Sequence, residues 1–157
     1  MPRHHETRVL PYTPQQMYDL VADVQSYPQF LPWTAAARIR SREQSGAAEV
    51  MLADLVISFK VFRETFGSRV VLHPDERKIE TSYIDGPFHH MESLWVFREA
   101  AGYGDRAACE VDFTVDFEFR NRLLPGAATM FFNDAMTRVV RAFERRAADL
   151  YGPAGTA

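Results

Sequence analysis

Apolar and polar side chains alternate along residues 109–119. The apolar positions are Cys109, Val111, Phe113, Val115, Phe117 and Phe119, and the residues between them are acidic or Thr. A period of two indicates a strand with one apolar face and one wet face. The same period extends from about residue 35 to residue 120. Turn-forming residues interrupt it at 45–46, 73–75, 85–87 and 102–105. This region therefore predicts a run of antiparallel strands.

Helical spacing replaces the alternation near both ends of the chain. After a short strand expected at residues 6–10, Thr13 can cap a helix, Pro14 suits its first position and Gln16 can complete a capping box. The apolar face of this helix is formed by Met17, Leu20, Val21 and Val24. Residues 127–151 predict a long amphipathic helix. Its apolar positions are Phe132, Met136, Val139, Phe143 and Leu150.

The order strand, helix, many strands and long helix predicts an α+β fold in which the last helix covers one face of an antiparallel sheet. With 157 residues, the chain is close to the length of one typical domain. We expect a single domain over residues 4–151. The remaining segment, 152–157, is rich in Gly and Pro and is expected to be a disordered tail.

Charge and composition narrow the functional classes. The chain has 18 basic and 21 acidic residues, a net charge of -3, so the electrostatic argument for nucleic-acid binding is absent and no DNA partner is expected. The first residues, MPRHHETR, lack the apolar stretch of a signal peptide, and we expect a cytoplasmic protein, peripheral to the inner face of the membrane. Cys109 is expected to be a small buried hydrophobe. Because 12 of the residues are Phe, the rings must either pack tightly or line a pocket.

Five stretches of the chain carry a family resemblance. They are DVQSYPQFLPW at 23–33, RETFGSRV at 63–70, DGPF at 85–88, VDF to FEF at 111–119, and AFERRA at 142–147 followed by LYG. Together they resemble the coenzyme Q-binding START-domain family, part of the polyketide cyclase/dehydrase-like superfamily, over nearly the whole chain and in order. One departure is Thr34, which stands where the family has Cys, so this position has no thiol chemistry.

The resemblance implies a helix-grip START-like fold, in which a curved sheet wraps around the C-terminal helix and encloses an apolar cavity. It also implies non-enzymatic binding of ubiquinone or a related polyprenyl quinone or lipid, supporting respiration or ubiquinone biosynthesis. No catalytic residue, metal or required cofactor is expected. The expected partners are the quinone, the membrane surface, and respiratory or biosynthetic enzymes.

Some bacterial members are described as toxins that block association of ribosomal subunits, which makes a ribosomal subunit the alternative partner. A third alternative is a cyclase-like enzyme with Glu64 or Tyr83 inside the cavity.

A polyprenyl quinone requires a large apolar cavity with one or two hydrogen-bonding groups. The residues predicted to line it are Phe62, Phe66, Trp95, Phe97, Phe113, Phe117, Phe132 and Met136. The alternative is that these rings fill a closed core. Glu64 shares strand parity with Phe62 and Phe66, which would place a carboxyl on the apolar face, where burial would raise its pKa. An ion pair with an Arg, or a bulge that turns Glu64 outward, is the other explanation.

The remaining candidate residues lie at the ends of the elements. Tyr27, Phe30, Leu31, Trp33, Leu123 and Leu124 are predicted to flank a cavity mouth and contact a bilayer, or else to plug the ends of the sheet. Arg138, Arg141, Arg145 and Arg146 form a basic side of the last helix, either solvated or in contact with RNA or phospholipid. The His4–His5 pair lies in an expected mobile terminus, and His89 and His90 point to opposite faces, so no metal site is predicted.

Overall fold

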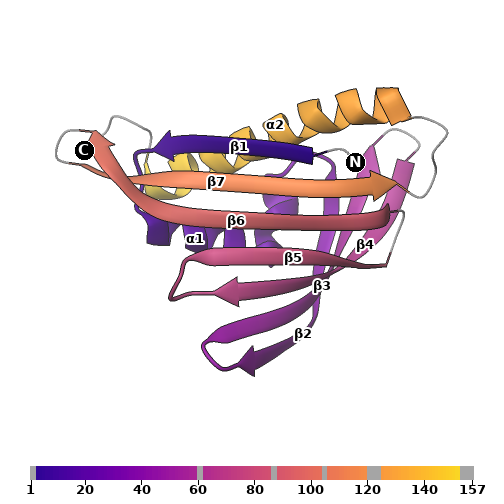
Figure 1. Cartoon of the computed structure of the whole chain (residues 1–157), viewed down its shortest axis with the longest axis horizontal. Coiled ribbons are helices and arrows are strands. Elements are labelled where there is room, and N and C mark those ends of the chain that lie inside the picture. Colours follow the sequence, from indigo (N-terminus) through magenta and orange to yellow (C-terminus); the bar gives the residue numbers. More distant parts are fainter. Residues whose placement is uncertain (1–2, 60–61, 86–87, 104–105, 120–124, 153–157) are drawn as a thin grey trace.

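The computed structural model describes residues 3–59, 62–85, 88–103, 106–119 and 125–152. In chain order the elements are β1 (Arg3–Leu10), α1 (Pro14–Ala22), the 3-10 helix η1 (Val24–Gln29), β2 (Thr34–Ser45), β3 (Ala48–Phe59), β4 (Phe62–His73), β5 (Lys78–Asp85), β6 (Phe88–Tyr103), β7 (Arg106–Phe119) and α2 (Pro125–Tyr151). Figure 1 shows one curved sheet with both α-helices behind it, which confirms the predicted α+β architecture.

Strands β2 to β7 form a meander, and the first strand, β1, extends the sheet beside the last strand, β7. The seven strands lie in the order β1-β7-β6-β5-β4-β3-β2, and every pair is antiparallel. Strand β1 pairs with β7 from Arg3 opposite Asp116 to Leu10 opposite Cys109. Register shifts interrupt the ladders between Ile39 and Ser41 and between Gly67 and Ser68. Such irregularities increase local twist and help to bend a sheet.

The N-terminal part of the chain differs from its sequence prediction. The first strand begins at Arg3 rather than at residue 6, and the expectation of a mobile His4–His5 terminus is wrong. The backbone ladder with β7 continues to Arg3, which stands opposite Asp116. Two exposed side-chain contacts accompany it: Arg3 Nε lies 3.4 Å from Asp116 Oδ1, and His5 Nε2 lies 2.6 Å from Asp112 Oδ1. The long C-terminal helix likewise begins two residues earlier, at Pro125.

The predicted capping box of α1 is confirmed. The backbone N–H of Gln16 donates to Thr13 Oγ1 at 3.0 Å, and the backbone N–H of Thr13 donates to Gln16 Oε1 at 2.9 Å. Two orphan donors at the helix start are thereby satisfied. This fixes the start of α1, whose Met17 and Val21 are each only 1% exposed beneath the sheet.

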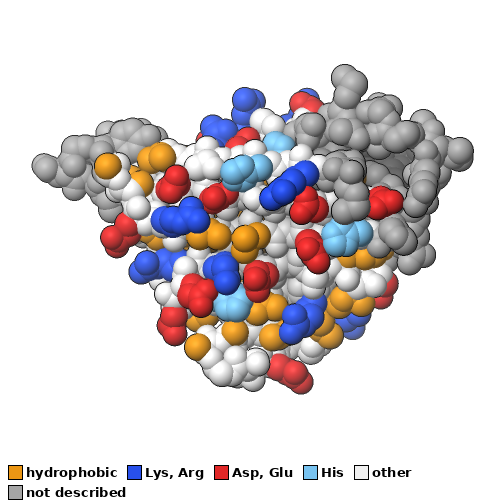
Figure 2. Space-filling model, viewed as in Figure 1, with side chains coloured by type: hydrophobic (Ala, Val, Ile, Leu, Met, Phe, Trp, Pro, Cys, Tyr) orange, Lys and Arg blue, Asp and Glu red, His pale blue; other side chains and the backbone are white. Residues whose placement is uncertain are grey.

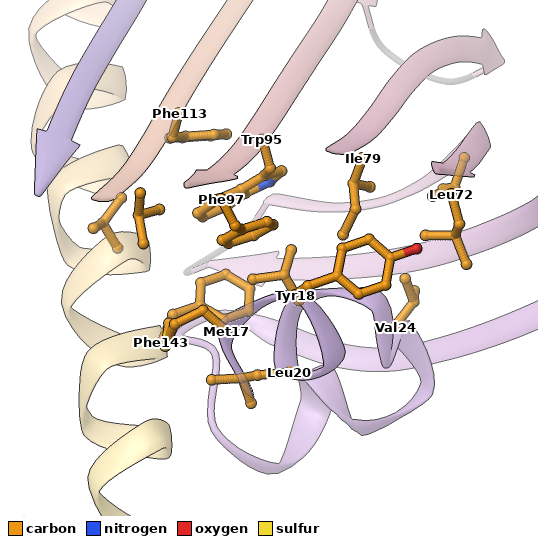
Figure 3. Packing of buried hydrophobic residues seen from close by; sticks show 14 of the residues in the cluster. Met17, Tyr18, Leu20, Val24, Leu72, Ile79, Trp95, Phe97, Phe113 and Phe143 are labelled. Carbon is orange, nitrogen blue, oxygen red and sulfur yellow. The ribbon is translucent and has the colours of Figure 1, made fainter. Parts of the chain in front are cut away.

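The core lies between α1, α2 and one face of the sheet, called here the inner face (Figure 3). The alternation predicted for β7 is confirmed, because Cys109, Val111, Phe113, Val115 and Phe117 are all at most 5% exposed. Helix α2 adds Val140, Phe143 and Ala147. Burial raises the pKa of the Cys109 thiol to about 11, so this residue is the inert hydrophobe that the sequence predicts.

The opposite, outer face of the sheet is mixed: acidic, basic and His side chains lie among hydrophobic ones (Figure 2). Arg40 donates to both carboxylate oxygens of Asp54 and lies 3.5 Å from Asp85 Oδ1. A Cβ at position 67 would overlap the present position of the Asp85 carboxylate, so a larger residue there would require Asp85 and Arg40 to shift. A shallow hollow of about 430 Å³ on this face is lined by Arg3, Arg69, Glu80, Glu92 and Asp116, among others.

Candidate functional site

Aromatic rings from neighbouring strands pack together on the inner face. Trp95 stacks on Phe113 with the ring centroids 4.1 Å apart, because the two residues are opposite each other in the β6–β7 register. Trp95 also meets Phe143 of α2 edge-on at 5.2 Å, and Tyr18 of α1 meets Phe97 edge-on at 6.1 Å. Figure 3 shows these side chains converging from β6, β7, α1 and α2. Around Trp95 and Phe97 the rings therefore form a closed core rather than the wall of an open space.

Burial on the inner face decreases toward the end of the sheet where α2 begins. Phe117 is fully buried, but its cross-strand neighbour Met91 is only half-buried. Phe66 of β4 and Met136 of α2 are also half-buried, and both pack against the core. Strands β4 and β6 begin at this end, and β7 ends there (Figure 1). We call it the α2-start end; its inner-face side chains at Phe66 and Met91 are less buried than Trp95 and Phe97.

Six of the predicted lining residues come together as expected. They are Phe66, Trp95, Phe97, Phe113, Phe117 and Met136, all in or against one apolar cluster. The side chains of Phe62 and Phe132 lie outside the described part of the structure. Whether the clustered residues contact a ligand stays a prediction.

Glu64 does not occupy the buried position that its parity suggested. It stands opposite Ile57 in the β3–β4 register, yet its side chain is exposed. Parity assigns the residue to a face, but at this end of β4 none of the described elements buries its side chain. The interpretation of Glu64 as a buried acid on the apolar face is therefore wrong, whereas a ligand contact by this side chain stays a prediction.

The predicted mouth segment packs largely against the protein itself. Tyr27 and Phe30 meet Phe143 edge-on at 5.4 Å and 5.3 Å, and the guanidinium of Arg146 lies 5.2 Å from the centre of the Phe30 ring. The Tyr27 hydroxyl donates to the Val21 carbonyl at 2.5 Å, and burial raises the pKa of this phenol. These contacts favour the alternative in which η1 closes one end of the sheet.

The other members of that predicted set differ among themselves. Leu31 is half-buried against the core, and Trp33 is half-buried with a φ of 62°. A bulky residue in this left-handed region is a conformational outlier, and such strain is typical of functional positions. Leu123 and Leu124 lie outside the described residues. A bilayer contact by any of these side chains stays a prediction.

Sequence reasoning missed a charged cluster between β1 and α2. The β1–α2 charge cluster consists of His4, Glu6, Arg8 and Glu144, and the three β1 members alternate along the inner side of that strand. Arg8 forms an ion pair with Glu144 of α2. The side chains of His4 and Glu6 are only 12% and 18% exposed, and His4 Nε2 lies 3.9 Å from Glu6 Oε1. No hydrophobic alternation marks residues 3–8, so the only available signal was the alternation of the charged residues themselves.

Burial raises the pKa of the Glu144 carboxyl despite its ion pair with Arg8. A carboxyl whose pKa is higher in the native than in the unfolded protein takes up a proton on folding between the two pKa values, so acidification through that interval stabilises the native state. We expect the unfolding free energy of the wild type to rise relative to Glu144→Gln as the pH falls from about 7 to about 4. Urea unfolding of both proteins across this range measures the difference. A difference that shrinks on acidification would show that the charge on Glu144 stabilises the fold through Arg8.

The described residues provide neither a metal site nor a membrane span. Among them no three His, Cys, Asp or Glu side chains are grouped as metal ligands would be. Nor does any helix in the described ranges combine the length and apolar character needed to cross a bilayer.

Comparison with known proteins gives a match over most of the chain. Residues 10–144 match the family described as polyketide cyclase / dehydrase and lipid transport. The ribosome association toxin RatA of Rickettsia prowazekii is 35% identical over 147 residues, which are 92% of this chain and 94% of that protein. The mitochondrial coenzyme Q-binding protein COQ10 homolog B of Xenopus laevis is 33% identical over 95% of this chain, which spans 59% of that longer protein.

A solved structure is similar over the whole domain. The solution structure of the 18 kDa protein CC1736 from Caulobacter crescentus superposes with a TM-score of 0.78, at 36% identity over 98% of this chain and 100% of that protein. The arrangement of sheet and final helix described above is therefore shared with an experimentally determined fold.

Proposed function

Because the chain belongs to the polyketide cyclase / dehydrase and lipid transport family, we propose that it binds ubiquinone or a related polyprenyl quinone between the inner face and α2, without reacting it. The observation that carries this proposal is the apolar inner face, which faces α2, includes the rings of Trp95, Phe97 and Phe113, and is less tightly buried at the α2-start end. The name of the coenzyme Q-binding relative, similar over 95% of this chain, supports the choice of ligand.

Such a protein acts by sequestration. Each tail CH₂ transferred from water to an apolar site contributes about 0.8 kcal/mol, so enclosure of even one isoprenoid unit provides useful affinity. No catalytic group, metal or cofactor is needed for this activity. The protein would work in the cytoplasm, touch the inner face of the membrane transiently, and present the quinone to respiratory or biosynthetic enzymes.

The test is to identify what the protein carries. It is purified without detergent from a quinone-producing bacterial host and extracted with organic solvent, and the extract is examined by mass spectrometry and ultraviolet absorption. A stoichiometric polyprenyl quinone is the expected result, and its mass gives the tail length. A protein that is empty or holds only phospholipid, and that takes up no added quinone, would overturn the proposal.

A second candidate function is inhibition of ribosomal subunit association. It is favoured by the 35% identity to the ribosome association toxin over 94% of that protein. The surface concerned would be the basic side of α2, where Arg141 and Arg145 are exposed. Arg146 is not part of such a surface, because its Nη2 donates to Gln29 Oε1 at 2.8 Å. Arg138 is already paired with Asp134 at 3.1 Å.

Sucrose-gradient analysis of a bacterial extract tests this candidate. If it is correct, the purified protein shifts 70S ribosomes to free subunits, and Arg141→Glu with Arg145→Glu abolishes the shift while quinone content stays the same. Unchanged 70S ribosomes at a several-fold excess of protein over ribosomes would exclude it.

A further inference from the structure

Two largely buried polar side chains lie beside the rings of the inner face. In the β1–β7 register His4 stands opposite Val115 and Glu6 stands opposite Phe113, so both side chains share the inner face with these residues. The His4 ring centroid is 6.4 Å from that of Phe113, which in turn stacks on Trp95. A hydrogen-bonding pair therefore adjoins a flat aromatic surface.

Polar atoms of this pair lack hydrogen-bond partners. His4 Nε2 and Glu6 Oε2 are both buried, and neither forms a hydrogen bond with any described group. Two charged groups lie nearby but beyond hydrogen-bond distance. His4 Nε2 is 3.9 Å from Glu6 Oε1, and Arg8 Nη1 is 4.0 Å from Glu6 Oε2. Nearly all buried polar groups in proteins are paired, since leaving one unpaired is costly, so such an exception calls for an explanation.

The location of the pair agrees with the less tightly closed end of the inner face. Strand β1 and helix α2 run in the same direction in Figure 1, and Arg8 near the end of β1 meets Glu144 in the second half of α2. His4, at the start of β1, therefore lies toward the first half of α2. This is the α2-start end, where Met91, Phe66 and Met136 are half-buried.

We propose that His4 and Glu6 bind the polar head group of the quinone, with His4 Nε2–H donating to a ring carbonyl and Glu6 accepting from a ring hydroxyl of the reduced form. The proposal rests on the proposed function and adds the head-group site to it. A quinone carbonyl only accepts hydrogen bonds, whereas a hydroquinone hydroxyl also donates. One donor and one acceptor side by side thus serve both oxidation states.

Another explanation for these charges is protection of a sheet edge. Strand β1 is an edge strand, and inward-pointing charged residues discourage edge-to-edge association. That explanation requires only charge and not a hydrogen bond to a ligand. Substitutions on the two sides of β1 separate the two explanations.

The experiment measures quinone affinity by quenching of tryptophan fluorescence. The probes are a benzoquinone of the ubiquinone type with a ten-carbon tail, its reduced form, and a hydrocarbon of matched length without a head group. The variants are His4→Leu, His4→Gln, Glu6→Leu and, as a matched control, His5→Leu. His5 is adjacent in β1 but points to the outer face, where it pairs with Asp112. Circular dichroism and urea unfolding verify that each variant is folded.

We expect His4→Leu to weaken binding of the oxidised quinone about tenfold and His4→Gln to restore most of it, because the amide keeps a donor. Glu6→Leu should weaken the reduced form selectively. His5→Leu should change the affinity for neither form, and no variant should change hydrocarbon binding.

Equal binding of quinone by wild type and His4→Leu, which would mean that only water solvates His4, overturns the inference. So does an equal loss for the hydrocarbon, which would indicate a packing defect. Failure of the wild type to bind quinone at all would instead refute the proposed function.

Discussion

Phe143→Ala will lower the free energy of unfolding by about 3 to 5 kcal/mol, the range found when a buried Phe is truncated. Phe143 is 3% exposed, and its ring contacts Tyr27, Phe30 and Trp95 at centroid distances of 5.4, 5.3 and 5.2 Å. It therefore joins α2 to η1 and to β6 at once. Truncation removes these contacts and leaves a cavity that three separate elements would have to move to fill. Urea unfolding followed by circular dichroism measures the change.

Leu150→Ala is the control on the same helix. Leu150 is 51% exposed, so its truncation should cost less than about 1 kcal/mol. Similar losses for the two variants would mean that the Phe143 ring is not the link between these elements.

Ser93→Phe will reduce quinone binding more than about tenfold, which corresponds to 1.4 kcal/mol of binding free energy. Ser93 lies in an inner-face row between Thr81 of β5 and Val115 of β7, and it is half-buried although Val115 is only 5% exposed. A phenyl group at this position would occupy the space that we assign to the ligand. The proposal requires this space to be available in the free protein, so the free energy of unfolding should change by less than about 1 kcal/mol.

The adjacent Leu94→Phe is the matched control. Both residues border the outer hollow, but only Ser93 shares the strand parity of the buried Trp95. The same ring placed at Leu94, on the other face of the strand, should therefore leave quinone binding intact. If Leu94→Phe rather than Ser93→Phe abolishes binding, the ligand occupies the outer hollow. If Ser93→Phe instead costs about 1 to 3 kcal/mol of stability, the inner face is overpacked and has no space for a ligand.

Local patterns predicted the elements, because each depends on residues near in sequence. The alternation of β7 and the capping box at Thr13 are of this kind, and both are confirmed. The extension of β1 to Arg3 depends on Asp112 and Asp116, more than a hundred residues away, and residues 3–8 have no apolar alternation to signal it.

The candidate site was only partly predictable for a related reason. Strand parity correctly placed Trp95, Phe113 and Phe117 on one buried face. The same rule failed at Glu64, because parity identifies the face of a strand and not how far the covering layer extends along it. Burial of His4 depends on pairing with β7 and on the position of α2, neither of which is encoded near residue 4.

The pairing of the first strand with the last strand sets an order of assembly. Strands β2 to β7 are hairpin neighbours and can pair one after another as the chain leaves the ribosome, whereas β1 has no partner until the region around Asp116 has been synthesised. Closing so long a loop has an entropic cost that short hairpins avoid. Strand β1, with His4 and Glu6, is therefore the last to join the sheet, and a nascent chain acquires its head-group site only when the whole sheet is complete.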